Sequence, residues 1–327
     1  MLRFVVLLLI LLAGLSAGPG AAAQDRVRFG LDWKPEAEYG GYYQALATGL
    51  YRKAGLDVTI VPGGPQVNQA QLLLAGRLDL VITGNSFLAL NAVQQAVPIT
   101  AVAAFFQKDP AVLIAHPGQG NDSFEALRGK PILIGSDTRA GWWNFLKARF
   151  GYTDAQIRPY TFNAAPFLSD PHAIQQGYVT SEPFSIEQAT GQKPVVLMLS
   201  DAGFNGYGSL VSTRDDMIAQ HADVVQRFIA ASIEGWKSYL HGDPSPAFAL
   251  IKKENPEMPD ALLAYARQAL IDRGIVESGD ALTLGIGAMT DARWESFAKA
   301  IEDARLYPTS LDWKRAYTLR FVDKGAP

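Results

Sequence analysis

Short apolar runs alternate with amphipathic segments through the first third of the chain, and this alternation predicts strands separated by helices. The expected strands are residues 27–31, 56–61 and 78–82, and the expected helices are residues 42–53, 67–75 and 87–95. Glycine ends two of these helices, as Gly55 and Gly76. Strands joined by helices of this length predict a parallel sheet with right-handed crossovers.

A second set of strands and helices follows a Lys-Asp-Pro segment at 108–110, where we expect the chain to cross into a second lobe. The expected strands are 99–106 before the crossing and 111–115, 131–135, 156–162, 177–181 and 194–199 after it. Residues 124–129 predict a short helical turn and 140–150 a helix. This part of the chain therefore predicts a second α/β sheet.

The remainder of the chain is expected to be helical. Apolar residues from Met217 to Leu240 recur at three- and four-residue spacing, and 261–271 and 291–305 repeat the pattern. We expect this tail to pack back onto the first lobe. The prediction is thus a two-lobed α/β protein, each lobe a mostly parallel sheet flanked by helices, with lobe I at 24–108 plus 205–327 and lobe II at 109–204.

The first 23 residues are typical of a secretory signal peptide. Arg3 precedes an apolar run from Phe4 to Leu15, and small residues end the segment at Ala23. A membrane anchor is the alternative, but the run is too short to span a bilayer. Removal leaves 327 − 23 = 304 residues, which we expect in the periplasm.

Composition excludes several classes of protein. Hydrophobic residues make up 48% and charged residues 19%, which excludes a disordered chain, and the net charge of −3 without a basic block makes nucleic acid an unexpected partner. The chain has no cysteine, which excludes disulfides, thiolate metal sites and a lipidated anchor. We expect a free monomer.

Candidate chemistry gathers where predicted strands end and helices begin, which is where open α/β sheets bind ligands. The candidate ligand-binding residues are Asp32, Trp33, Glu38, Tyr39, Tyr42, Asn85, Ser86, Ser136, Thr138, Arg139, Trp142, Glu182 and Tyr207. The aromatic rings offer stacking faces, the carboxylates accept hydrogen bonds, and the short polar residues cap helices or bind polar ligand atoms. Arg139 could hold an anion, and Glu182 could pair with an amino-substituted heterocycle. Each also has an ordinary structural interpretation, as buried core, helix cap, salt bridge or linker.

Three segments resemble the NMT1/THI5-like family: residues 31–35 with 49–58, residues 76–80, and Glu182-Pro183. The resemblance covers most of the mature chain. It implies the type II periplasmic binding protein fold, no cofactor, and an ABC importer whose permease is the partner. Relatives of this family bind thiamine pyrimidine precursors, riboflavin, nitrate, alkanesulfonates, taurine or aromatic acids.

One branch of the family comprises thiamine pyrimidine synthases, and the chain departs from that branch. Tyr39 stands in place of the enzyme's His, Thr83 in place of its cofactor-binding Lys, and 203–208 replaces its Cys-rich loop without a cysteine. The four histidines share no metal-ligand spacing, and a Ser-x-x-Lys match at 296–299 lacks its companion motifs. The resemblance therefore implies a binding protein and not an enzyme.

The hypothesis drawn from the sequence is a periplasmic solute-binding protein whose ligand is a small planar heterocycle, foremost a thiamine-pathway aminopyrimidine. Riboflavin, an aliphatic sulfonate or nitrate, and an aromatic carboxylate remain alternatives. A synthase-like enzyme and a module that signals through its closed form are alternatives of another class.

Overall fold

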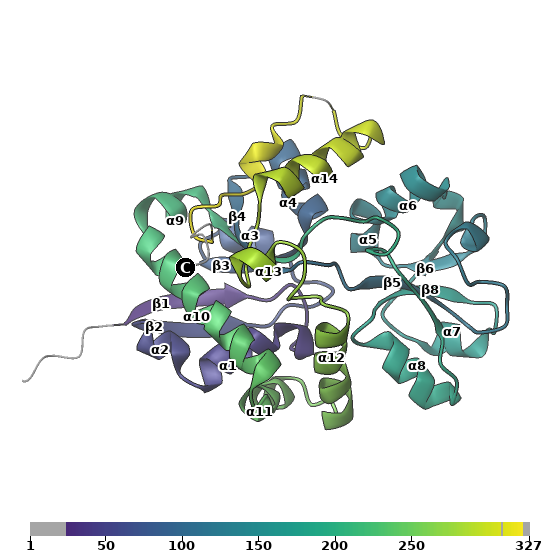
Figure 1. Cartoon of the computed structure of the whole chain (residues 1–327), viewed down its shortest axis with the longest axis horizontal. Coiled ribbons are helices and arrows are strands. Elements are labelled where there is room, and N and C mark those ends of the chain that lie inside the picture. Colours follow the sequence, from purple (N-terminus) through teal and green to yellow (C-terminus); the bar gives the residue numbers. More distant parts are fainter. Residues whose placement is uncertain (1–23, 309, 323–327) are drawn as a thin grey trace, which may run out of the picture.

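A computed structural model describes residues 24–308 and 310–322; the predicted signal peptide lies outside the described residues. The chain forms two five-stranded sheets, each flanked by helices, which lie side by side as two lobes (Figure 1). Lobe I contains β1 (Asp25–Gly30), β2 (Leu56–Val61), β3 (Leu80–Asn85), β4 (Ile99–Phe106) and β10 (Gly208–Arg214). Lobe II contains β5 (Ala111–Ala115), β6 (Ile132–Ile134), β7 (Ile157–Pro159), β8 (Ile174–Tyr178) and β9 (Val195–Met198).

Both sheets have the same plan, with one strand running against the other four. The orders are β2-β1-β3-β10-β4 and β7-β6-β8-β5-β9. In lobe I, β10 pairs antiparallel with β3 and β4, and in lobe II, β5 pairs antiparallel with β8 and β9. The two reversed strands follow the two segments that cross between the lobes, because the crossing chain enters the next sheet from the edge between the lobes, where the other strands end, and so runs against them. The expectation of mostly parallel sheets is confirmed.

Helices cover both sheets. Those packed around the lobe I sheet are α1 (Gly40–Ala47), α2 (Leu50–Lys53), α3 (Gln69–Leu74), α4 (Ser86–Gln94), α9 (Asp215–Gln220), α10 (Ala222–His241), α11 (Ser245–Glu254), α12 (Asp260–Asp272), α13 (Ala281–Leu284) and α14 (Asp291–Asp303). Lobe II has α5 (Ser136–Ala140), α6 (Trp143–Phe150), α7 (Ala165–Ser169) and α8 (Glu182–Thr190). Short 3-10 turns are η1 (Ala37–Tyr39), η2 (Glu125–Leu127), η3 (Asp154–Gln156) and η4 (Trp313–Ala316). Within the described ranges, no helix is long and apolar enough to cross a membrane.

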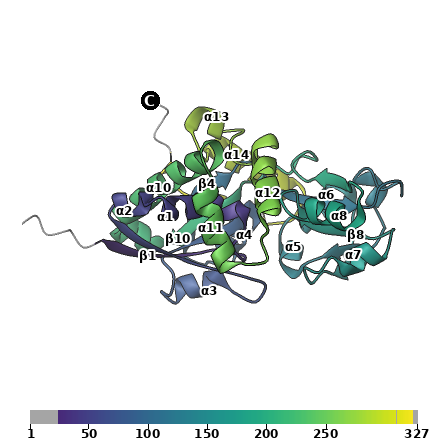
Figure 2. The same cartoon turned by 90° about the horizontal axis from the view of Figure 1, so that it is seen from below.

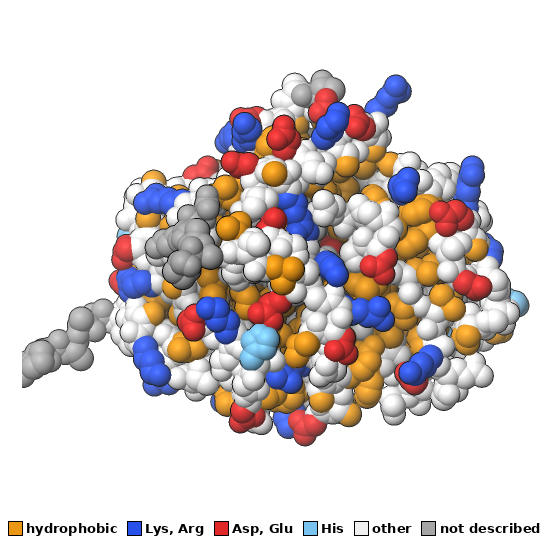
Figure 3. Space-filling model, viewed as in Figure 1, with side chains coloured by type: hydrophobic (Ala, Val, Ile, Leu, Met, Phe, Trp, Pro, Cys, Tyr) orange, Lys and Arg blue, Asp and Glu red, His pale blue; other side chains and the backbone are white. Residues whose placement is uncertain are grey.

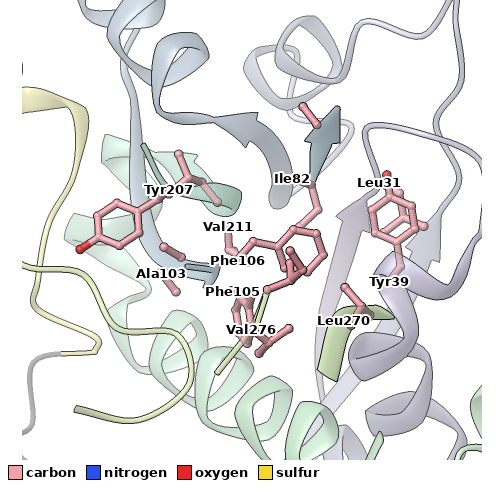
Figure 4. Packing of buried hydrophobic residues seen from close by; sticks show 14 of the residues in the cluster. Leu31, Tyr39, Ile82, Ala103, Phe105, Phe106, Tyr207, Val211, Leu270 and Val276 are labelled. Atoms are coloured by element: carbon pink, nitrogen blue, oxygen red, sulfur yellow. The ribbon is translucent and has the colours of Figure 1, made fainter. Parts of the chain in front are cut away.

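Large aromatic side chains form the core of lobe I. The ring of Tyr42 contacts Phe29, Phe105 and Trp236, with centroid distances of 4.8, 5.1 and 5.7 Å. Figure 4 shows Phe105 and neighbouring apolar side chains in this cluster. Helices α1 and α10 pack closely where Gly41 of α1 faces Trp236 of α10. A Cβ atom at Gly41 would lie 2.1 Å from the Trp236 ring, so only glycine fits there. The C-terminal tail thus packs on lobe I, as predicted.

Two predictions about the second half were wrong. The segment after residue 205 is not wholly helical, because Gly208–Arg214 forms β10 between β3 and β4. The predicted strand at 177–181 is displaced: β8 spans Ile174–Tyr178, with Gln175 fully buried inside it. The expected lobe boundaries remain a prediction.

Helix α12 lies at the border between the lobes in both views (Figures 1 and 2). Its Tyr265 hydroxyl donates to the Val179 carbonyl of lobe II at 3.1 Å, and its ring lies 5.1 Å from that of Phe184. The two lobes therefore meet at the end of β8.

Candidate ligand-binding site

The carboxyl ends of β1 and β8 meet between the lobes. Thr180, two residues past β8, donates a hydrogen bond to Glu38 Oε1 of η1, and both residues are buried. Nearby, the ring of Trp33 after β1 lies 4.5 Å from that of Phe162 after β7. Strand ends from both sheets thus enclose one site, as the general rule for open α/β sheets predicts.

Tyr178 lies at this site, and we use the term crevice for the solvent-accessible edge of the site at its ring. Its side chain is 38% exposed, yet burial raises the pKa of its hydroxyl well above the usual value, and the charges of Asp109, Asp32, Glu38 and Glu182 raise it further. Solvent therefore reaches a ring that is surrounded by carboxyl groups from both lobes.

Glu182, the first residue of α8, points its carboxyl back across the end of β8. Oε2 accepts from the Tyr178 backbone N–H at 2.8 Å, and Oε1 accepts a long bond of 3.5 Å from the Tyr160 hydroxyl. Burial raises the pKa of Glu182 to about 7, against hydrogen bonds that lower it. Burial therefore favours the protonated form of this carboxyl, and its Oε1 side is weakly engaged.

Asp109 lies in the first crossing, at the base of the site. It is 2% exposed, and Oδ1 accepts from the Ala111 backbone N–H at 2.9 Å. Burial raises its pKa to about 7, while hydrogen bonds from Ala111 and the Asn85 side chain lower it.

Glu36 and Glu38 add two more carboxyls from the loop after β1. Burial raises the pKa of Glu36 well above its usual value, and the nearby charges of Glu38 and Glu182 raise it further. Burial also raises the pKa of Glu38, which the bond from Thr180 partly offsets. Lys34 lowers the pKa of Glu36, but its ammonium is bonded to Glu257 at 3.1 Å.

This concentration of acidic groups is not balanced by ion pairs. In the described part of the chain, Glu36, Glu38, Asp109 and Glu182 form none. Nor do the described residues contain a group of three or more His, Asp or Glu that could hold a metal ion. The site is thus rich in proton acceptors and aromatic faces, an arrangement suited to a flat molecule that donates hydrogen bonds.

Some of the candidate residues join this site. Asp32 accepts from the Tyr39 hydroxyl at 2.7 Å, and both lie with Trp33, Glu38 and Glu182 around the crevice. Asn85 caps α4 and bonds to Asp109. Ser136 and Thr138 lie in the first turn of α5. Gly135, which precedes this helix, packs against Phe162, because a Cβ atom at Gly135 would lie 3.3 Å from that ring. The start of α5 is therefore beside the site.

Other candidates are buried or have partners within the protein, and their role in ligand binding stays a prediction. Tyr42 is fully buried in the core of lobe I. Ser86 bonds both ways with the Tyr207 backbone, and the Tyr207 hydroxyl bonds to Asp280 on the far side of the sheet end. Trp142 is 4% exposed in the core. Arg139 is exposed. Hydrogen bonds from Lys147 and Trp143 lower the pKa of Asp154, and the charge of Arg139 lowers it slightly further.

Several residues of the site were not predicted from sequence: Glu36, Asp109, Tyr160, Phe162, Tyr178 and Thr180. The strand-end rule could have found most of them. The predicted strands ran too far, through Phe162 in one case and Ser181 in the other, so residues that follow β7 and β8 were placed inside strands.

The solved structures that the chain resembles show its fold. It matches the alkanesulfonate-binding protein SsuA of Xanthomonas axonopodis pv. citri, solved with MOPS, with a TM-score of 0.64 and 15% identity over 91% of this chain and 99% of that one. SsuA of Escherichia coli matches with a TM-score of 0.65 and 15% identity over 89% and 91%. The chain therefore has the two-lobed fold of the periplasmic binding proteins of ABC importers.

The family follows from the sequence comparison. The NMT1/THI5 like family model matches residues 36–247, more than half of the chain, so the chain belongs to this family. It is 25% identical over 324 residues to the riboflavin-binding protein RibY of Chloroflexus aurantiacus, covering 95% of this chain and 91% of RibY. The 4-amino-5-hydroxymethyl-2-methylpyrimidine phosphate synthase THI11 of Saccharomyces cerevisiae is also 25% identical, but over 33% of this chain and 32% of the synthase.

Proposed function

We propose that this protein is a periplasmic solute-binding protein that binds an aminopyrimidine of the thiamine pathway between its lobes and delivers it to an ABC permease. The chain would be exported by residues 1–23, act as a monomer and carry out no reaction. RibY and SsuA, which match over most of their length, are binding proteins by name, whereas the synthase matches over a third of its length.

One observation carries the choice of ligand: among the described residues, Glu36, Glu38, Asp109 and Glu182 form no ion pair, and burial raises the pKa of Glu182 to about 7. A 4-aminopyrimidine presents an amino donor beside a ring nitrogen that accepts. A carboxyl that shares one proton with the ring nitrogen, and accepts from the amino group, satisfies both atoms. Trp33 and Phe162 would enclose the faces of the ring.

The same charges disfavour the anionic alternatives. A sulfonate, nitrate or carboxylate ligand would lie beside Glu36, Glu38 and Glu182, which offer it no cation, and any of these carboxyls that is ionised would repel it.

Riboflavin is the second candidate, favoured by the similarity to RibY over nearly the whole chain. Its isoalloxazine ring is flat and suits the aromatic faces. Its pyrimidine edge, however, presents two carbonyl oxygens around one N–H, and carbonyl oxygens gain little from a site of carboxyl acceptors.

A thermal-shift panel on the exported chain, residues 24–327, tests the proposal. It would compare 4-amino-5-hydroxymethyl-2-methylpyrimidine, riboflavin and MOPS. A ligand at 100 times its dissociation constant stabilises the native state by ~2.7 kcal/mol. Stabilisation by the pyrimidine supports the proposal; stabilisation by riboflavin alone or by MOPS alone would replace it with that ligand class.

A further inference from the structure

The two segments that cross between the lobes are held by one buried side chain, Arg293 of α14. Its guanidinium donates to the Gln107 carbonyl of the first crossing and to Gln107 Oε1 at 3.2 Å. It also donates to the Asn205 carbonyl at 3.1 Å and the Gly206 carbonyl at 3.3 Å, both in the second crossing. The two crossings, about a hundred residues apart in sequence, therefore share one donor.

The environment of Arg293 fixes its orientation. The guanidinium lies over the Tyr207 ring at 4.2 Å from the centroid, and the side chain is 12% exposed. Asp280 lies 3.8 Å from it and also accepts from the Tyr207 hydroxyl. A planar group with donors on several sides can bond to two backbone segments at once, which a lysine ammonium on a flexible stem cannot do with the same geometry.

Backbone hydrogen bonds near the guanidinium show where each crossing segment leaves lobe I. In the first crossing, the Gln107 and Lys108 N–H groups donate to the Ile275 carbonyl at 2.7 and 3.2 Å, whereas Ala111 already belongs to β5. In the second, Phe204 N–H donates to the Leu199 carbonyl at 3.0 Å on the lobe II side, and Asn205 is held by Arg293. The backbone links that lie between these hydrogen bonds are thus at Asp109, before Pro110, and between Phe204 and Asn205; the Phe204 ring itself packs on Phe87 and Phe297 of lobe I and on Phe145 of lobe II.

We propose that Arg293 is a positioning residue that fastens both crossings to lobe I, and thereby confines lobe rotation to Asp109-Pro110 and the Phe204–Asn205 link. Hinge motions are absorbed by a few residues at the ends of elements, and a narrow hinge gives one well-defined closing path. The inference depends on the two-lobed fold and not on the identity of the ligand.

The absence of cysteine allows a direct test on the ligand-free protein. Spin labels at Lys53→Cys on α2 and Gln188→Cys on α8, both exposed, report the distance between lobes by double electron–electron resonance. Arg293→Lys is expected to broaden the distance distribution and shift it toward longer distances. The matched control is Arg267→Lys, because Arg267 also donates to backbone carbonyls, those of Tyr239 and Leu240 at 2.7 Å, but within lobe I.

A broader distribution in Arg293→Lys and an unchanged one in Arg267→Lys support the proposal. Equal distributions in both variants, or equal broadening in both, overturn it. If Arg293→Lys does not fold, Tyr207→Phe keeps the ring under the guanidinium and removes its bonds to Asp280 and to Thr290 N–H. In that variant, unchanged hydrogen exchange at residues 107–110 and 203–207 would also overturn it. Since no ligand is used, failure here is distinct from failure of the proposed function.

Discussion

Thr180 of lobe II donates its hydroxyl hydrogen bond to the Glu38 carboxyl of lobe I, and this buried bond joins the lobes beside the crevice. A bond of this kind exists only while the lobes are together, so it favours the closed form. If the Thr180 hydroxyl is removed, the buried Glu38 carboxyl loses its hydrogen-bond donor.

Thr180→Val is therefore expected to weaken ligand binding. Loss of a donor to a buried charged group costs about 1–3 kcal/mol, which corresponds to roughly 5- to 150-fold in the dissociation constant. The control is Thr213→Val, since Thr213 is equally buried but donates to the Asp79 carbonyl within lobe I at 2.6 Å. Calorimetric titration should give weaker binding in Thr180→Val alone; a similar loss in both variants would show that the bond acts only on stability.

Two substitutions at Glu182 separate its hydrogen bonding from its charge. Gln offers the N–H donor and the C=O acceptor of a protonated carboxyl, so Glu182→Gln should retain most of the affinity for the aminopyrimidine. Glu182→Met removes both bonds and should lose about 10- to 100-fold, at roughly 1 kcal/mol or more for each bond. Equal affinity in all three proteins would remove Glu182 from the site.

Asp109 predicts a pH dependence of stability. Its pKa is raised from 3.8 to about 7 in the folded protein, so the native state binds a proton that the unfolded state has released. The free energy of unfolding should therefore fall as pH rises from about 4 to about 7 and be level above that, by an amount of the order of 2–4 kcal/mol.

Asp109→Asn isolates this contribution. The variant keeps one oxygen to accept from the Ala111 N–H but cannot ionise. Denaturant unfolding between pH 4.5 and 8 should show the native protein losing stability relative to Asp109→Asn as pH rises. Parallel curves for the two proteins would mean that the carboxyl titrates normally.

Trp33 should report ligand binding optically. It is half-buried beside Phe162, whereas Trp142, Trp143, Trp236 and Trp294 are buried in the core. A heterocycle that stacks on Trp33 should change its fluorescence, and Trp33→Phe should remove most of that change. The expected loss of affinity is about 3- to 10-fold, because ring pairs contribute about 0.5–1.5 kcal/mol beyond burial. A fluorescence change that persists in Trp33→Phe would place the ligand elsewhere.

Much of the lobe I fold could be predicted from the sequence because its strands are apolar and bounded by glycine and proline. β2 and β4 were predicted with the bounds that the structure gives. β10 was missed because a Gly- and Ser-containing strand carries little apolar signal, although the sheet buries it on both sides. In β8, the polar side chain of Gln175 is fully buried, which no periodicity could indicate.

The candidate site could be predicted only in part, because the type of a residue does not show whether it is buried. Residue type suggested Trp33, Glu38 and Glu182, which the structure brings together between the lobes, but it could not distinguish an aromatic ring in a site from one in a core. Tyr42 and Tyr207 resemble Tyr178 in type, yet Tyr42 and Tyr207 are buried at 0% and 1% and Tyr178 is 38% exposed. That difference arises from helix packing and from where β8 ends.

On the face of the molecule that Figure 3 draws, basic and acidic side chains are interspersed over both lobes without a basic patch. The acidic groups that are concentrated in one place are those between the lobes.

Isothermal titration of the exported chain with 4-amino-5-hydroxymethyl-2-methylpyrimidine and, separately, with an alkanesulfonate tests the central claim most directly. The pyrimidine should bind with one-to-one stoichiometry at pH 6.5. Its affinity should fall above pH 7.5, because Glu182 then loses the proton that it shares with the ring nitrogen. The sulfonate should give no heat of binding. Tight binding of the sulfonate, with none of the pyrimidine, would contradict the account.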